Sequence, residues 1–177
     1  LSILNSFVKR KDWADLENYL SKMSKSIPSS ELKLCENNAI DGVAGHYYHR
    51  YKDLEIPCVF KLELPKELSV SEIDICLVLS NLLENALEAS MRTAPDKRRI
   101  TVFARMHSDN VVLIKVENFY NGVVKEKNGI FESSKHSGEG IGTQSVRRIA
   151  EKGGGYCRFT QKDSIFTADV MLRGNSK

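Results

Sequence analysis

Two periods of hydrophobic and polar positions follow one another along this chain, and each predicts a different kind of element. Apolar residues recur at helical spacing over residues 1–10, 12–27, 31–51, 70–90 and 143–155. Alternation of apolar and polar residues predicts a strand over residues 58–65, and two hairpins are predicted further on, with strands over residues 98–108 and 111–118 and over residues 156–163 and 165–173. This order favours an α+β fold, a two-layer sandwich in which the helices lie on one face of a sheet.

The first two helices, within residues 1–30, form a predicted helical hairpin. Its second helix carries one stripe of large apolar side chains, Trp13, Leu16, Tyr19, Leu20 and Met23. Such a stripe must pack on another apolar surface, for example on a second copy of the chain. We therefore expect two domains, a helical hairpin at residues 1–30 and a larger α+β domain at residues 31–177.

Composition narrows the class of protein without defining it. The chain has 177 residues, of which 41% are hydrophobic, and a net charge of +3, which gives no indication of nucleic-acid binding. Its four cysteines form no CxxC motif, which favours free thiols in a reducing compartment over zinc ligands or disulfides. No apolar run reaches the ~18 residues of a membrane span. Because the chain has neither an initial Met nor a signal peptide, we expect a fragment or a processed product, and a membrane region could lie outside it.

The helix predicted over residues 70–90 carries an unusual polar stripe. Asn81, Asn85 and Glu88 fall within about 60° of one another on a helical wheel, opposite the leucines. Asparagine is a poorer helix former than Lys or Glu, so a purely solvated face has little need of two. Its amide hydrogen-bonds phosphate, and its oxygen can bind a hard cation such as Mg²⁺. A solvated face that happens to be rich in Asn is the alternative.

A second polar signal lies just before the helix at residues 143–155. Gly138, Gly140 and Gly142 alternate with other residues and lead directly into the helix. Alternate glycines let the backbone approach a ligand closely, and a helix N-terminus supplies free N–H groups for phosphate. The motif does not follow the first strand of a βαβ unit and lacks the GK[ST] of a P-loop, so it predicts neither of those nucleotide folds.

The two motifs together resemble the GHKL, or Bergerat-fold, ATP-binding domain of sensor histidine kinases. The stretch "NLLENALEA" resembles the N box of that family and "GEGIG" its second glycine box. The order of the intervening elements also agrees, over residues 31–173. The chain is most similar to the quorum-sensor and citrate-sensor-like kinases of Gram-positive bacteria. By this resemblance, residues 1–30 are part of a dimerisation hairpin and residues 31–177 are the catalytic ATP-binding domain.

The resemblance implies a role for each residue of these motifs. Asn85 matches the asparagine that binds Mg²⁺, and Asn81 matches the catalytic polar position that contacts phosphate or polarises the attacking group. Glu88 matches an acidic position that could hold a metal-bound water. The second glycine box would bind the phosphates of ATP through its backbone and includes Gly138, Gly140, Ile141 and Gly142.

The first glycine box departs from the family pattern. Its DxGxG is replaced by "NFYNG", in which Asn118 stands for the Asp and Gly122 for the last glycine. Asn118 keeps a carbonyl oxygen that can accept the adenine amino group but lacks the charge. Because a hydrogen bond to a charged group is worth ~1.5–3 kcal/mol against ~1 for a neutral one, weaker nucleotide binding is expected.

Residues 123–137 resemble the loop that covers bound ATP. Lys135 matches a lysine that contacts phosphate in the similar kinases. For His136, Arg147 and Arg148, an ordinary exposed position is favoured over a ligand contact. His46 and His49 have metal-ligand spacing, but no third ligand is evident in the sequence.

The resemblance also implies partners and a location. The full-length protein would be a membrane-tethered homodimer with a cytoplasmic kinase domain, a response regulator as its partner and no nucleic acid. The acceptor histidine of the family precedes residues like those at 1–4, so this chain should bind Mg²⁺–ATP without phosphorylating itself.

Three other classes remain open at this point. A GHKL serine kinase acting as an anti-sigma factor usually lacks a long N-terminal hairpin. A nucleotide-independent docking module is suggested by Asn118 and Tyr120 in the first glycine box. A gyrase-like ATPase uses a glutamate where this chain has Asn81, and an Asn cannot accept a proton, so hydrolysis should be slow.

Overall fold

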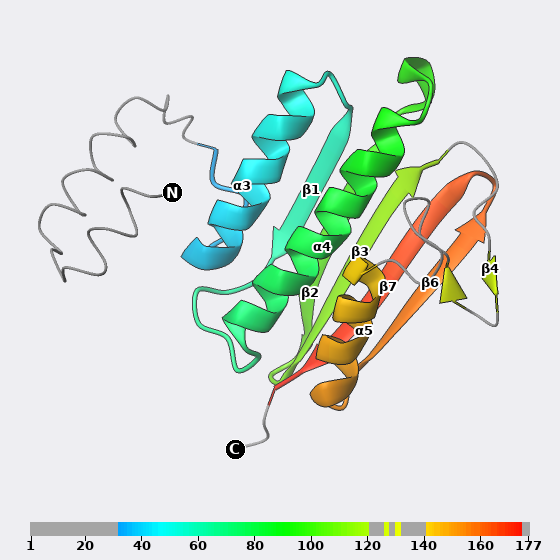
Figure 1. Ribbon diagram of the computed structural model, residues 1–177. Coiled ribbons are helices and arrows are strands. Elements are labelled where there is room, and N and C mark those ends of the chain that lie inside the picture. The colour runs from blue at the N-terminus through cyan, green and yellow to red at the C-terminus, as the bar shows by residue number, and fades with distance from the viewer. Residues whose placement is uncertain (1–31, 121–125, 128–129, 132–140, 175–177) are drawn as a thin grey trace, which may run out of the picture. The chain divides into compact units, whose positions relative to one another are not determined.

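The computed structural model describes residues 32–120, 126–127, 130–131 and 141–174 (Figure 1). Contacts along the chain separate residues 1–32 from residues 33–177, and the second unit carries the α+β fold. The hairpin predicted at residues 1–30 lies outside the described residues. The helices are α3 (Asn38–Asp53), α4 (Glu72–Met91), the short 3₁₀ helix η1 (Pro95–Lys97) and α5 (Ile141–Lys152). The strands are β1 (Cys58–Glu63), β2 (Ile100–Ser108), β3 (Val111–Phe119), β4 (Glu126–Lys127), β5 (Ile130–Phe131), β6 (Tyr156–Lys162) and β7 (Ile165–Arg173).

The main sheet has five strands in the order β1-β2-β3-β7-β6. Strand β1 pairs in parallel with β2, and all other neighbours are antiparallel. Helices α3, α4 and α5 lie side by side in front of this sheet (Figure 1). The predicted two-layer α+β sandwich is therefore confirmed. Strands β4 and β5 form a separate pair within the segment that the sequence predicted as a loop.

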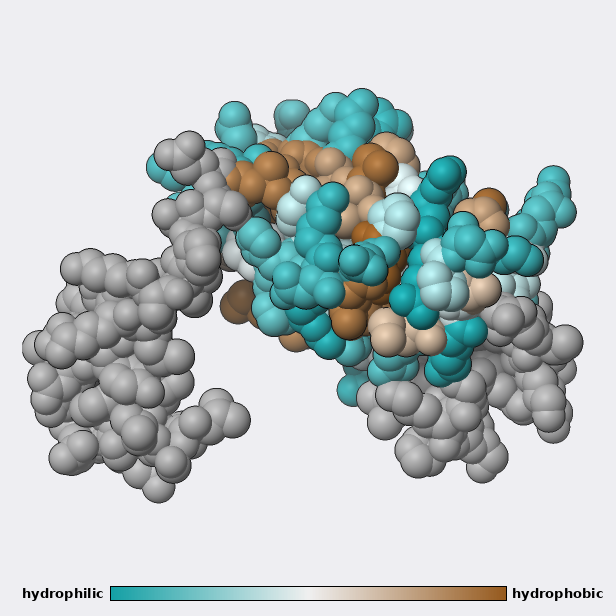
Figure 2. Space-filling model, turned by 90° about the horizontal axis from the view of Figure 1, so that it is seen from above, coloured by the Kyte–Doolittle hydropathy of each residue, from teal (hydrophilic) through white to brown (hydrophobic). Residues whose placement is uncertain are grey.

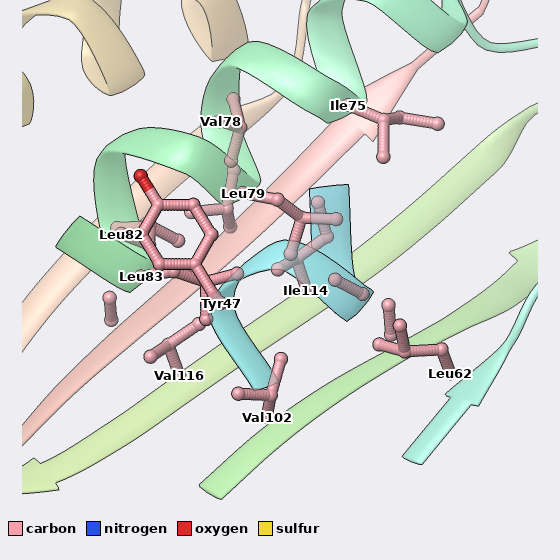
Figure 3. Close-up of a cluster of buried hydrophobic side chains, with 14 of the residues drawn as sticks. Tyr47, Leu62, Ile75, Val78, Leu79, Leu82, Leu83, Val102, Ile114 and Val116 are labelled. Atoms are coloured by element: carbon pink, nitrogen blue, oxygen red, sulfur yellow. The ribbon is translucent and has the colours of Figure 1, made fainter. Parts of the chain in front are cut away.

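The core lies between the helices and the sheet. Figure 3 shows Leu79 and Leu83 of α4 directed toward Ile114 and Val116 of β3, and all four side chains are buried. Seen from above, apolar residues gather between polar margins (Figure 2). Burying a Leu, Ile or Val side chain is worth about 1.5–3 kcal/mol, so this layer fixes how α4 is rotated about its axis. Because its core face is fixed, the opposite stripe of α4 must face away from the sheet.

The ends of two helices differ from the sequence prediction. The helix predicted over residues 31–51 begins only at Asn38, because the Asn37 side chain caps it by accepting from the backbone N–H groups of Ala39 and Ile40. Helix α5 begins two residues earlier than predicted, at Ile141, and ends at Lys152. Gly154, two residues after the end of α5, adopts the left-handed conformation that commonly follows a helix, with φ of 73°.

Candidate functional site

The N-box helix α4 presents its polar stripe as the sequence predicted. The Ser71 side chain caps the helix by accepting from the backbone N–H of Asp74 at 3.2 Å. Asn81, Asn85 and Glu88 are each half-buried, neither packed in the core nor fully exposed. Partial burial lowers the competition from water for the hydrogen bonds that these side chains could make to a ligand.

Gly142, at the start of α5, lies directly against both asparagines. A Cβ atom built on Gly142 would lie 3.2 Å from Asn85 Nδ2, 3.3 Å from Asn85 Oδ1 and 3.3 Å from Asn81 Oδ1. The fold thus brings together two motifs that are about sixty residues apart in the sequence. Only a glycine leaves the two amides undisturbed at this distance, and the free N–H groups of the α5 N-terminus lie beside them.

The two amides differ in how they are held. Asn81 Nδ2 donates to the carbonyl oxygen of Leu77, one turn earlier, at 2.8 Å. This bond fixes the amide and leaves Oδ1 as an acceptor on the side of Gly142. Within the part of the chain that the structure describes, the amide of Asn85 has no hydrogen bond. Asn85 therefore keeps its oxygen and both N–H donors available for a ligand.

Asn118 lies near the end of β3 and is only 4% exposed. Its Nδ2 donates to the carbonyl oxygen of Phe119 at 3.0 Å. A carbonyl can only accept, so this contact fixes the orientation of the amide and leaves Oδ1 as the remaining acceptor. This arrangement provides the acceptor that the resemblance assigned to the adenine amino group.

Two further polar residues, which sequence reasoning missed, lie at and just after the C-terminal end of α4. Thr93 Oγ1 donates to the carbonyl oxygens of Ala89 and Phe119, at 2.9 and 3.4 Å. Ser90 is fully buried, and its Oγ has no hydrogen-bond partner among the described residues. The missed signal is the position of Ser90 on the core side of the α4 wheel, opposite Asn81, where an apolar residue is expected. From Asn81 to Ser90, α4 thus carries polar groups over a length of about 14 Å.

The other residues of the predicted site cannot be placed in the same way. Gly122, Lys135, His136, Gly138 and Gly140 lie outside the described residues, as does the side chain of Ile141. The backbone of α5 begins at Ile141, so Gly142, the last glycine of the motif, lies in the first turn of the helix.

No cluster of potential metal ligands from His, Cys, Asp and Glu occurs among the described residues, so His46 and His49 gain no third ligand there. The four cysteines, all among the described residues, form no disulfide, and burial raises the pKa of the Cys35, Cys58 and Cys76 thiols. None of the described helices combines the length and the apolar character needed to cross a bilayer.

Glu84 connects α4 to α3 and was not singled out from the sequence. Its Oε2 lies 2.7 Å from Arg50 Nη1 and accepts from the Tyr47 hydroxyl at 3.1 Å. The buried Tyr51 hydroxyl donates to the carbonyl oxygen of Leu83 at 2.7 Å. These bonds hold α3 against the part of α4 that lies between Asn81 and Asn85.

This network predicts a loss of stability at high pH. Burial, followed by the hydrogen bond to Glu84, raises the pKa of Tyr47 to about 12. An unfolded tyrosine loses its proton near pH ~10, so the stabilisation from neutral Tyr47 is complete below that pH and is lost as the pH approaches the folded-state pKa. Urea denaturation across this range should show a falling free energy of unfolding, with a shallower fall for Tyr47→Phe. An identical pH dependence in the variant would contradict this role of Tyr47.

Comparison with known proteins identifies the family. Residues 70–173 match the family model described as the GHKL domain, and the chain belongs to this family. It is 26% identical over 169 residues to the sensor histidine kinase HprS of Escherichia coli strain K12, a match that covers 90% of this chain and 34% of HprS. The chain therefore spans about a third of the length of that relative.

Solved structures agree on the fold. The catalytic domain of the histidine kinase ThkA has a TM-score of 0.59 at 19% identity, covering 78% of this chain and 93% of that one. The Acinetobacter baumannii histidine kinase AdeS has a TM-score of 0.56 at 15% identity, covering 78% and 64%. The chain thus has the fold of a histidine kinase catalytic domain, as predicted, whereas the quorum-sensor and citrate-sensor subgroup stays a prediction.

Proposed function

We propose that this chain is the ATP-binding and kinase portion of a two-component sensor histidine kinase. The observation that carries the proposal is the contact of Gly142 with Asn81 and Asn85. This contact brings the polar stripe of α4 next to the N-terminus of α5, and the two together form one half-buried polar site. Family membership and the similarity to HprS support the same function.

In this proposal, the phosphates of ATP bind between α4 and α5. Asn85 would hold a Mg²⁺ ion, with Glu88 binding one of its waters, and the amide of Asn81 would contact the γ-phosphate. The ion would supply charge neutralisation at the phosphoryl group. The N–H groups at the start of α5 add further stabilisation of negative charge. Phosphoryl transfer depends mainly on such placement and electrostatic stabilisation, which this site can provide without a covalent step.

The adenine would bind at the C-terminal end of α4. Asn118 Oδ1 is the acceptor for the adenine amino group, and its burial protects the bond from water. Gly122, Lys135 and the glycines Gly138 and Gly140 complete the proposed nucleotide site from segments outside the described residues. We further propose the partners of the sequence prediction, which are a dimer, a response regulator and a membrane-tethered full-length protein of the quorum-sensor or citrate-sensor type.

Labelled ATP tests this function. With Mg²⁺ and γ-labelled ATP, the chain alone should bind nucleotide but incorporate no phosphate. With the histidine-bearing helix of the longer kinase added in trans, acid-labile, base-stable phosphate should appear on that helix. Phosphoserine on a partner protein would instead identify an anti-sigma-type serine kinase. A folded chain that binds no nucleotide at millimolar concentration would identify a docking module.

A further inference from the structure

The sheet face opposite the helices carries a groove that the proposed kinase function does not use. No described helix lies on this face (Figure 1). The groove has a volume of about 550 Å³ and is lined by residues of all five strands of the main sheet. This volume falls within the range of about 300–1,000 Å³ that is typical of binding sites.

Two rows of paired residues form the floor of the groove. In one row, Phe103, Lys115, Asp169 and Arg158 are successive partners from β2 to β6. In the adjacent row, the partners are Arg105, Leu113, Met171 and Tyr156. Phe103 is 38% and Tyr156 is 48% exposed, so aromatic surface is open to solvent between charged side chains.

The charges of the groove do not balance. Its lining includes four cationic side chains, Lys61, Arg105, Lys115 and Arg158, and two carboxylates, Glu63 and Asp169. Both carboxylates already have a lysine partner: Lys61 Nζ lies 3.2 Å from Glu63 Oε1, and Lys115 Nζ lies 3.6 Å from Asp169 Oδ1.

Arg105 and Arg158 are the two cationic side chains of the groove that have no carboxylate partner there. The side chain of neither arginine makes a hydrogen bond or an ion pair with any residue that the structure describes. An unpaired arginine has a planar set of donors that matches a carboxylate with two parallel hydrogen bonds. The groove therefore offers two carboxylate-binding positions on either side of apolar surface.

We propose that this face binds an extended acidic peptide segment of a partner protein, with an apolar side chain between two carboxylates. The carboxylates pair with Arg105 and Arg158, and the apolar side chain packs on the surface formed by Leu113 and Phe103. This interaction lies on the face of the sheet opposite α4 and α5 and does not depend on the proposed kinase function.

The distance between the two arginines determines how far apart the two carboxylates of the peptide must be. Strands β2 and β6 are separated by β3 and β7, and the two arginines lie in adjacent rows, which together places them about 16 Å apart. An extended chain rises about 3.3 Å per residue and places positions i, i+2 and i+4 on one face. The matching motif is therefore acidic–x–apolar–x–acidic.

A peptide titration tests the proposal on the full chain. The probe is a blocked peptide of aspartate, serine, phenylalanine, serine and aspartate. Two controls replace both aspartates by asparagine, or keep the composition with the aspartates at i and i+2. Backbone amide NMR signals of Phe103, Lys115 and Asp169 should shift with the probe, and each control peptide should bind roughly tenfold more weakly.

The variant arm uses the Arg105→Gln/Arg158→Gln double substitution, with folding checked by thermal unfolding and amide signal dispersion. We expect roughly tenfold weaker binding of the probe and a loss of the difference between the probe and the asparagine peptide. Equal binding of all three peptides, or no shift at millimolar probe, would overturn the proposal. Stronger binding of a single-stranded oligonucleotide, or self-association through this face, would overturn it as well.

Discussion

Asn85→Ala should lower the affinity for Mg²⁺–ATP by about 100-fold and remove its dependence on Mg²⁺. The Asn85 amide makes no hydrogen bond within the described part of the chain, yet it lies beside Gly142 at the start of α5. Its removal leaves the proposed metal ion without a protein ligand. Calorimetry with a non-hydrolysable ATP analogue, with and without Mg²⁺, measures the change.

The control for this variant is Ile73→Ala. Ile73 is on the same helix and is 72% exposed, so its truncation should change neither nucleotide affinity nor fold. The unfolding midpoint of Asn85→Ala should also stay close to that of the unaltered chain. Mg²⁺-dependent binding of normal strength in Asn85→Ala would remove Asn85 from the site.

Gly142→Val should have an effect on nucleotide affinity as large as that of Asn85→Ala. A Cβ at this position already lies 3.2–3.3 Å from the amides of Asn81 and Asn85, so a branched side chain must displace them. Gly142→Ala requires shifts of only a few tenths of an ångström and should weaken binding about tenfold, while helix propensity slightly favours α5. The measurement is nucleotide affinity together with the free energy of unfolding.

Gly45→Ala is the matched control for these glycine variants. Gly45 is inside α3, and a Cβ there would meet nothing within 4 Å. The variant should gain about 0.5–1 kcal/mol of unfolding free energy at unchanged nucleotide affinity. If Gly142→Val bound nucleotide as well as Gly45→Ala, the asparagines would not contact the ligand in the observed arrangement.

The core elements of this fold could be predicted because their signals are local. The leucine face of α4 and the alternation in β2 and β3 each arise from one element facing one apolar layer. The polar stripe of α4 could be predicted for the same reason, since fixing its core face fixes the opposite side. The glycine motif at the start of α5 could be predicted as well, because glycine is favoured where the backbone must come close to a ligand or to another segment.

The first residue of α3 could not be predicted from the helical spacing of its apolar residues. Apolar spacing continues back to residue 31, but the Asp41 carboxylate accepts from the backbone N–H groups of Leu34 and Cys35, at 2.7 and 3.0 Å. Together with the cap at Asn37, these side-chain bonds satisfy backbone groups outside a helix. Whether these backbone N–H groups bond to side chains or within a helix depends on contacts in the folded protein, which the spacing of apolar residues does not show.

Other parts of the site depended on contacts between distant segments. The parallel pairing of β1 with β2 requires α4 to cross between them, and the link from Glu84 to Arg50 spans two helices. Thr93 donates to the carbonyl oxygen of Phe119 at the end of β3, a contact between segments 26 residues apart in the sequence. None of these pairings follows from the local spacing of residues.

The central claim is that Asn81, Asn85 and the start of α5 together bind a magnesium-bound triphosphate. NMR of the side-chain amides of Asn81 and Asn85 and the backbone amide of Gly142 tests it most directly, during titration with a non-hydrolysable ATP analogue. We expect all three signals to shift along one binding curve and the shifts to require Mg²⁺. Nucleotide binding that leaves these signals in place, or a folded chain that binds none at millimolar concentration, would contradict it.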